Sequence, residues 1–271
     1  MSVPSADAAA ALAADLAADL AAEHEALDRV VAGRSDDELL TATPAEGWDV
    51  RDELAHLAGF DENATAALRD PEGFTAGLAR ILETGEDPIA AITERGRSMA
   101  PVEVVEWWRR ARSELLSAIE QADPAARVPW YGPPMSHMSF VTARLMETWA
   151  HGQDVRDAYG VPPEVSNRLR HVAHIGIGAR TYSYVVRGLD VPEQPVAVRL
   201  TAPDGSEWTW GDPAAADVVS GPAVDFCLVV TQRRHLDDVD LTVQGPFAEE
   251  WMGIAQAFAG GPGPGRPPLQ R

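Results

Sequence analysis

The sequence has 271 residues, 45% of them hydrophobic, which is typical of a globular protein with one large domain or two smaller ones. Acidic residues outnumber basic residues by 42 to 22, so the net charge at pH 7 is −20. Binding to nucleic acid or to an anionic membrane depends on Lys and Arg, so we expect neither partner. Lysine is absent, which excludes Schiff-base catalysis and leaves every permanent basic charge to arginine.

Several features predict a soluble, cytoplasmic protein. No run of sequence approaches the ~20 apolar residues that are needed to span a bilayer. Arg29 is the first basic residue, so the N-terminus lacks the basic start of a signal peptide. Cys227 is the only cysteine, which excludes an internal disulfide and a cysteine-based zinc cluster. None of these features predicts an oligomeric state.

Apolar residues recur at helical spacing through most of the first 160 residues. Four long amphipathic helices of this kind predict a four-helix bundle. The long helices are expected over 6–32, with Ser5 as the N-cap, over 49–69, with Asp49 and Asp52 at its start, from Pro101 through Ile119, and over 139–159. Shorter pieces are a helical turn at 35–40, one or two short helices within 74–100, and a loop at 128–134.

The pattern changes after residue 163, and it predicts a small α+β domain. The elements expected there are a helix over 164–187, strands over 196–200 and 208–210, helices over 213–219 and 222–235, a strand over 241–243 and a helix near 246–258. The fold class is therefore α+β, mainly α. We expect a helical domain over 1–162, an α+β domain over 163–259 and a disordered Pro/Gly-rich tail over 260–271.

Three side chains on two predicted helices are candidates for a metal site. Glu147 and His151 are four residues apart, so their side chains lie ~40° apart on one face of a helix. His56 lies between leucines of an earlier helix, where a polar side chain at a helix contact requires a partner. A set of two His and one Glu leaves a coordination position open, as catalytic zinc sites do. Such pairs are also common on solvated helix faces, so the spacing alone leaves both interpretations open.

Two segments resemble the metal motifs of the DinB-like superfamily. The run Gly-Trp-Asp-Val-Arg-Asp at 47–52, followed by Ala-His-Leu at 55–57, resembles the first motif. The run Glu-Thr-Trp-Ala-His-Gly-Gln-Asp-Val at 147–155 resembles the second. Together they resemble the mycothiol-dependent maleylpyruvate isomerase branch, found in actinobacteria, over essentially the whole chain. The resemblance implies a DinB-like four-helix metal-binding domain and a smaller sterol-carrier-like domain. It implies His56, Glu147 and His151 as ligands of zinc or another divalent ion, and mycothiol as a cosubstrate.

The resemblance implies a metal-dependent enzyme that acts on a small metabolite. Our first hypothesis for its activity is a thiol-dependent isomerase or transferase. A thiol-independent hydrolase, isomerase or cyclase of secondary metabolism is the second hypothesis. A small-ligand-binding protein with a structural metal is the third. For an enzyme, the reactive group would be metal-bound water or thiolate. Cys227 lies in an apolar helical pattern and is predicted to be a core residue, so the thiol would come from outside.

Five further residues are candidates for contact with a small-molecule substrate. Trp130 and Tyr131 belong to the loop before the helix that carries Glu147 and His151, and their rings can overhang the open side of the metal. Arg233 and Arg234 are candidates for binding an anionic substrate, because a lysine-free chain of charge −20 relies on arginine and metal for positive charge. His24 lies on an apolar stripe and is either a substrate contact or a hydrogen-bonded core residue.

Overall fold

The computed structural model describes residues 6–269, with side chains from Ala10 onward. The chain divides into two units, Met1–Pro162 and Pro163–Arg271, and each is described by itself. Within residues 6–269, no helix has the length and apolar character that crossing a membrane requires.

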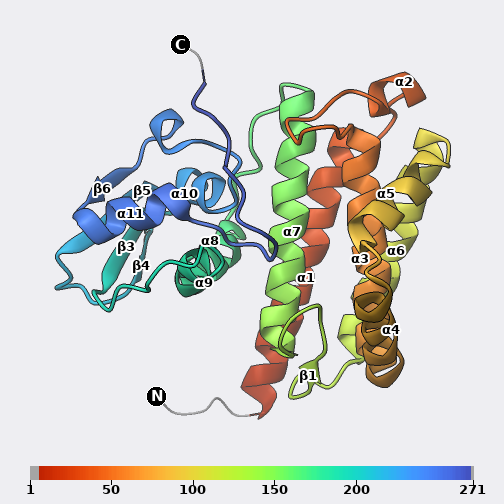
Figure 1. Cartoon of the computed structure of the whole chain (residues 1–271), viewed down its shortest axis with the longest axis horizontal. Helices are drawn as coiled ribbons and strands as arrows, with labels where there is room; N and C mark the ends of the chain where they lie inside the picture. The colour runs from red at the N-terminus through yellow and green to blue at the C-terminus, as the bar shows by residue number, and fades with distance from the viewer. Residues whose placement is uncertain (1–5, 270–271) are drawn as a thin grey trace. The chain divides into compact units, whose positions relative to one another are not determined.

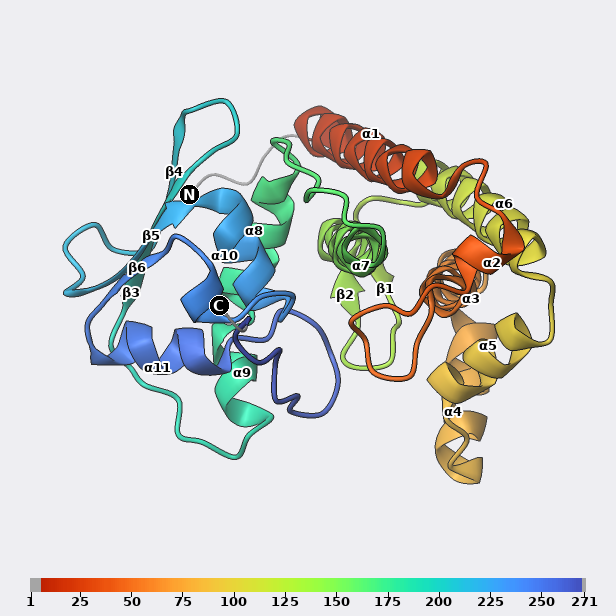
Figure 2. The ribbon, with the colours of Figure 1, turned by 90° about the horizontal axis from the view of Figure 1, so that it is seen from above.

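Four long helices form the first unit, as the sequence predicts (Figure 1). They are α1 (Ala6–Val31), α3 (Val50–Arg69), α6 (Pro101–Gln121) and α7 (His137–Ala158). Helix α7 packs against α1 and α3, and α6 packs against the same two helices, so the four close into a bundle (Figure 2). Three shorter helices lie between them in sequence: α2 (Asp36–Leu39), α4 (Pro71–Thr84) and α5 (Pro88–Arg97).

Local chemistry accounts for where the helices begin. Asp49 accepts a hydrogen bond from the amide of Asp52, and the Asp52 side chain caps the Asp49 amide in return, which starts α3. Pro101 is the first residue of α6 because a first-turn residue needs no N–H donor. Ser136 caps α7, so this helix begins two residues earlier than predicted. Ser5, the predicted cap of the first helix, lies outside the described residues.

Helix α7 is buried along most of its surface, and this positions the candidate metal ligands. It carries buried apolar residues, but also Arg144, Gln153 and Asp154, each at most 3% exposed. Burying a charged or polar side chain costs free energy unless it has a hydrogen-bond or ion-pair partner. These residues therefore indicate that polar contacts lie inside the bundle next to α7. A two-stranded hairpin, β1 (Arg127–Val128) and β2 (Met135–Ser136), closes the predicted loop immediately before α7.

The second unit is a small α+β domain with a four-stranded sheet. Its elements are α8 (Leu169–Gly178), α9 (Arg180–Val185), β3 (Val196–Thr201), β4 (Glu207–Trp210), β5 (Asp217–Pro222), α10 (Ala223–Val230), the 3₁₀ turn η1 (Leu236–Asp238), β6 (Thr242–Gln244) and α11 (Pro246–Ile254). The strand order is β4-β3-β5-β6, with β3 and β5 parallel and the outer pairs antiparallel. The helices of this unit lie on one face of the sheet (Figure 2). The predicted fold class, α+β and mainly α, is confirmed.

Two of the predicted elements in this unit are wrong, and the helix predicted over 222–235 ends at Val230. Residues 213–219 are not helical, because the chain from Asp217 forms β5 and pairs with β3. That pairing is a long-range contact that helical periodicity does not detect. The predicted helix over 164–187 begins only at Leu169 and breaks at Ala179. Helix α8 packs closely on α10, since a Cβ added at Gly176 would lie 2.6 Å from the side chain of Val230.

The Pro/Gly-rich tail has no helix or strand from Gly260 to Leu269, yet it is hydrogen-bonded to the second unit. The hydroxyl of Tyr182 donates to the carbonyl of Gly260 at 2.7 Å. The Arg266 guanidinium donates to the carbonyl of Arg233 at 2.9 Å. The described part of the tail is therefore irregular but anchored.

Candidate metal centre

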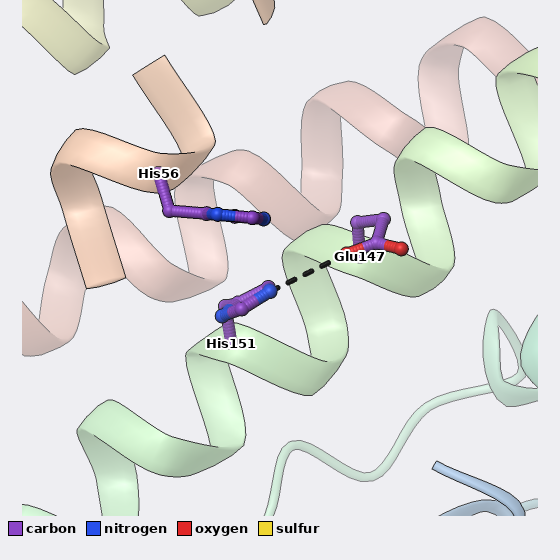
Figure 3. Close-up of side chains that lie close together, drawn as sticks. All are labelled: His56, Glu147 and His151. Atoms are coloured by element: carbon purple, nitrogen blue, oxygen red, sulfur yellow. Dashed lines mark ion pairs between the residues drawn. The ribbon is translucent and has the colours of Figure 1, made fainter. Parts of the chain in front are cut away.

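Three side chains from two helices point toward one another in the first unit (Figure 3). His56 comes from α3, and Glu147 and His151 come from α7. Each offers one ligand atom, and these atoms lie within 4.8 Å of one another. The two imidazole centroids are 4.3 Å apart, and Nε2 of His151 is 3.3 Å from Oε2 of Glu147. The structure thus brings together the three residues that the sequence predicts as ligands.

The backbone explains this convergence. Helices α3 and α7 pack against each other, and His56 lies on the face of α3 that meets α7. One turn of α7 separates Glu147 from His151, so both project toward His56. The side chains of Glu147 and His151 are 23% and 13% exposed, so the group is shielded but accessible from solvent. Two imidazole nitrogens and a carboxylate oxygen form a donor set that fits zinc or another divalent ion.

The charge on Glu147 suits a metal ligand. Burial raises the pKa of this carboxyl, but the hydrogen bond and charge of His151 outweigh it, with help from Arg144 and His56. The net effect lowers the pKa of Glu147 to about 2. At neutral pH the group is therefore a carboxylate, which is the form that binds a cation.

Glu53 is a residue of this site that our sequence reasoning missed. Its side chain is fully buried, and its Oε2 lies 2.7 Å from Nδ1 of His151. The hydroxyl of Thr43 donates to the other carboxylate oxygen at 2.8 Å. A signal was present in the sequence, because Glu53 precedes His56 by three residues and shares its helix face. Glu53, His151 and Asp154 also form a second group whose ligand atoms lie within 4.8 Å.

Aromatic rings surround the two histidines. The Trp48 ring lies 5.4 Å from that of His56 and stacks on His151 at 6.0 Å. The Phe60 ring lies 4.6 Å from His56 on the same helix. The Phe60 ring in turn contacts Tyr131 at 5.6 Å and Trp130 at 6.2 Å. The two loop aromatics are therefore separated from a candidate ligand by a single ring.

We call Phe60, Phe74, Trp130 and Tyr131 the aromatic wall. Trp130 stacks on Phe74 with ring centroids 5.7 Å apart and planes inclined by 6°. The amide of Asn63 donates to the Tyr131 hydroxyl at 2.9 Å, which ties the loop to α3. All four wall residues are partly exposed, so the wall offers apolar ring surface to a bound molecule.

His24 lies in the bundle core and is 1% exposed. Its Nε2 is 3.8 Å from a carboxylate oxygen of Asp61, and its ring meets the edge of Trp108. Burial, with the charges of Arg112 and Arg144, lowers the pKa of His24 to about 3. The side chain is therefore a neutral, buried group, which disfavours the alternative of a substrate contact.

The remaining candidates lie in the second unit. Arg233 and Arg234 follow α10 and are partly buried, and their guanidinium groups donate to the carbonyls of Thr231 and Arg233. Cys227 is buried, and burial raises its pKa well above the ordinary value of a thiol. Its thiol is therefore protonated and shielded, as expected for a core residue.

Comparison with known proteins places the chain in a family. The family model for the mycothiol maleylpyruvate isomerase N-terminal domain matches residues 20–156, which include all three candidate ligands. The chain belongs to this family. Two Mycobacterium tuberculosis relatives, the uncharacterized proteins MT0041 and Rv0036c, are each 43% identical over 248 residues. The match covers 90% of this chain and 95% of each relative.

Solved structures of the mycothiol-dependent maleylpyruvate isomerase share the fold. One is 18% identical with a TM-score of 0.54, and a mutant form is 14% identical with a TM-score of 0.56. Each comparison covers 82% of this chain and 89% of the other. Because these comparisons cover 82% of this chain, the shared fold extends beyond residues 20–156, which the family model matches. The predicted membership of the DinB-like branch is confirmed.

Proposed function

We propose that this protein is a zinc-dependent enzyme that uses mycothiol as cosubstrate in the isomerisation of a small metabolite or in thiol transfer to it. The observation that carries the proposal is the convergence of His56, Glu147 and His151 in a chain of the mycothiol maleylpyruvate isomerase family. These three side chains would hold the ion. A zinc ion bound there lowers the pKa of a thiol or water, which supplies a nucleophile at neutral pH.

Other residues of the chain would bind the substrate, and the cosubstrate would supply the thiol. The buried Cys227 does not supply the reactive thiol, so the thiol is that of the cosubstrate. Trp130 and Tyr131, as part of the aromatic wall, would contact the apolar part of the substrate. Arg233 or Arg234 would bind a substrate carboxylate, because a guanidinium fork matches a carboxylate in geometry and charge.

A cavity of the second unit bears on the ligand-binding alternative. It has a volume of about 460 Å³ and lies at the ends of β3 and β5, next to the start of α10. Thr201, Asp240 and Thr242 line it and are exposed. A protein that stores an apolar ligand encloses it in apolar surface. This cavity is open to solvent, and apolar residues such as Val165 and Val224 line it beside the polar ones, so it does not enclose a ligand as a storage protein does. A cavity open in this way favours an enzyme over a binding protein with a structural metal.

Calorimetric titration of the zinc-loaded protein with mycothiol tests the proposal. We expect saturable binding by the wild type and none by His56→Ala, since that variant lacks a ligand. Mycothiol disulfide, which has no free thiol, is the matched control and should not bind in the same way. Maleylpyruvate is the first substrate to test for turnover. A fully loaded protein that does not bind millimolar mycothiol would contradict thiol dependence and favour a thiol-independent hydrolase, isomerase or cyclase.

A further inference from the structure

The two ring nitrogens of His151 have different neighbours. Nδ1 lies 2.7 Å from Oε2 of Glu53, whereas Nε2 lies 3.3 Å from Oε2 of Glu147. Glu53 is fully buried, and Glu147 is partly exposed. His151 therefore lies between an interior carboxyl group and the carboxylate of the candidate metal centre.

We propose that Glu53 is a positioning residue that accepts a hydrogen bond from Nδ1–H of His151 and thereby keeps Nε2 available to the metal. This inference rests on the proposed metal centre, but it does not depend on the thiol or the substrate. A neutral imidazole carries one proton, so the nitrogen that donates to Glu53 leaves the other as the metal ligand. A carboxylate partner also makes the imidazole more basic, which strengthens its bond to a metal.

A short segment before α3 holds this arrangement in place. The hydroxyl of Thr43 donates to Oε1 of Glu53 at 2.8 Å, and the amide of Thr43 donates to the carbonyl of Trp48 at 2.9 Å. The indole of Trp48 stacks on the ring of His151. The segment thus restrains His151 twice, at its edge through Glu53 and at its face through Trp48. An imidazole held in this way loses little freedom when it binds a metal.

The same residues admit a rival arrangement, in which Glu53, His151 and Asp154 bind a second ion. Glu53 and Asp154 are 0% and 2% exposed, so such an ion would lie in the interior. The contacts favour the positioning role, because each oxygen of Glu53 already has its own neighbour, Thr43 for one and His151 for the other.

Zinc affinity, measured by competition with a chelator, is the first test. Glu53→Gln removes the charge and keeps the shape, and we expect it to weaken zinc binding by about 10- to 100-fold. Thr43→Val removes the hydroxyl that donates to Glu53 at 2.8 Å and, more weakly, to the carbonyl of Trp48 at 3.3 Å, and it should weaken binding by a smaller factor. Glu62→Gln is the matched control on α3, because Glu62 is 41% exposed and pairs with Arg95. Its zinc affinity should equal that of the wild type.

The ¹⁵N shifts of His151 in the zinc-loaded protein provide a readout that a general loss of stability would not move. In the wild type we expect a proton on Nδ1 and a metal on Nε2, and in Glu53→Gln a changed Nδ1 shift. If Glu53→Gln does not fold, Thr43→Val decides the matter by the same two measurements. Unchanged affinity and unchanged shifts in a folded variant would overturn the proposal.

Two results separate this inference from the proposed function. Two zinc ions per wild-type chain, with one lost in Glu53→Gln, would make Glu53 a ligand and overturn the positioning role alone. Zinc binding with the expected effect of Glu53→Gln, but without mycothiol binding, would overturn only the thiol-dependent function. A wild type that binds no divalent ion would overturn both.

Discussion

The indole ring of Trp48 lies over the imidazole ring of His151, with centroids 6.0 Å apart and planes inclined by 21°. The same indole lies 5.4 Å from the ring of His56. Trp48 thus borders two of the three candidate ligands. Its fluorescence is therefore a direct reporter of an ion at this centre.

We expect Co²⁺ to quench tryptophan fluorescence on binding, because the ion would lie next to this indole. Trp48→Phe should remove most of the quenching while the metal content stays the same. Trp210→Phe, at a partly exposed tryptophan of the second unit, is the matched control and should leave the quenching intact. Full quenching in Trp48→Phe would place the ion elsewhere.

The ligand assignment predicts that the protein, purified without added metal, contains about one divalent ion per chain, most simply zinc. His56→Ala and Glu147→Ala should each lose it, because a site without one ligand loses much of its affinity. Elemental analysis gives the metal content of each variant. His174→Ala, an exposed histidine outside the centre, should keep the metal. Undiminished metal in both ligand variants would be incompatible with the assignment.

A buried ion pair supports the helices that carry the ligands. The side chains of Asp61 on α3 and Arg144 on α7 are buried, and Oδ1 of Asp61 lies 2.8 Å from Nη2 of Arg144. Asp61→Ala should lower the free energy of unfolding by about 3–5 kcal/mol, because it leaves a buried charge unpaired. The double variant Asp61→Leu/Arg144→Met should recover most of that loss. Urea unfolding at pH 7 measures both, and a loss below about 1 kcal/mol would mean that the pair behaves like a surface pair.

His24 predicts a loss of stability in acid. Its pKa is about 3 in the folded protein and 6.5 in the unfolded chain, so below pH 6.5 protons bind mainly to the unfolded chain. The stability that His24 contributes is therefore complete above pH 6.5 and declines as the pH falls toward 3. Between pH 7 and pH 4.5 the decline is on the order of 2–3 kcal/mol.

The variant His24→Gln isolates this contribution, because Asp61, Arg112 and Arg144 face the same position and stay in place. Urea unfolding at pH 7 and pH 4.5 should show a smaller loss for His24→Gln than for the wild type. His174→Gln is the control, and its loss should match that of the wild type. An equal loss in all three proteins would show that His24 is protonated in the folded state.

The proposed carboxylate contact predicts a specific effect of lysine. Arg233→Lys or Arg234→Lys keeps the charge but removes the planar fork, and one of them should weaken the binding of a carboxylate substrate by about 1–3 kcal/mol. Metal content should not change, since neither residue is a ligand. Arg199→Lys, at an exposed position of β3, is the control. Wild-type binding by both variants would favour an uncharged substrate.

Local signals in the sequence determined most of the helical unit, whereas the candidate ligands followed from the resemblance of two segments to the DinB-like metal motifs. Asp49 and Asp52 mark the start of α3, because their reciprocal hydrogen bonds join residues only three positions apart. Pro101 marks the start of α6 by its own lack of an N–H donor. Glu147 and His151 share a face because one helical turn relates them.

Contacts between distant segments were decided only by the tertiary structure. Glu53 and His151 are 98 positions apart, and their hydrogen-bond contact exists only because α3 packs against α7. Asp217–Pro222 forms a strand because β3 provides a parallel partner, although the preceding alanines suggest a helix. His24 lies in the core because Asp61 and Trp108 from other helices meet it there. Local periodicity carries no information about such partners, because packing between elements selects them after the elements form.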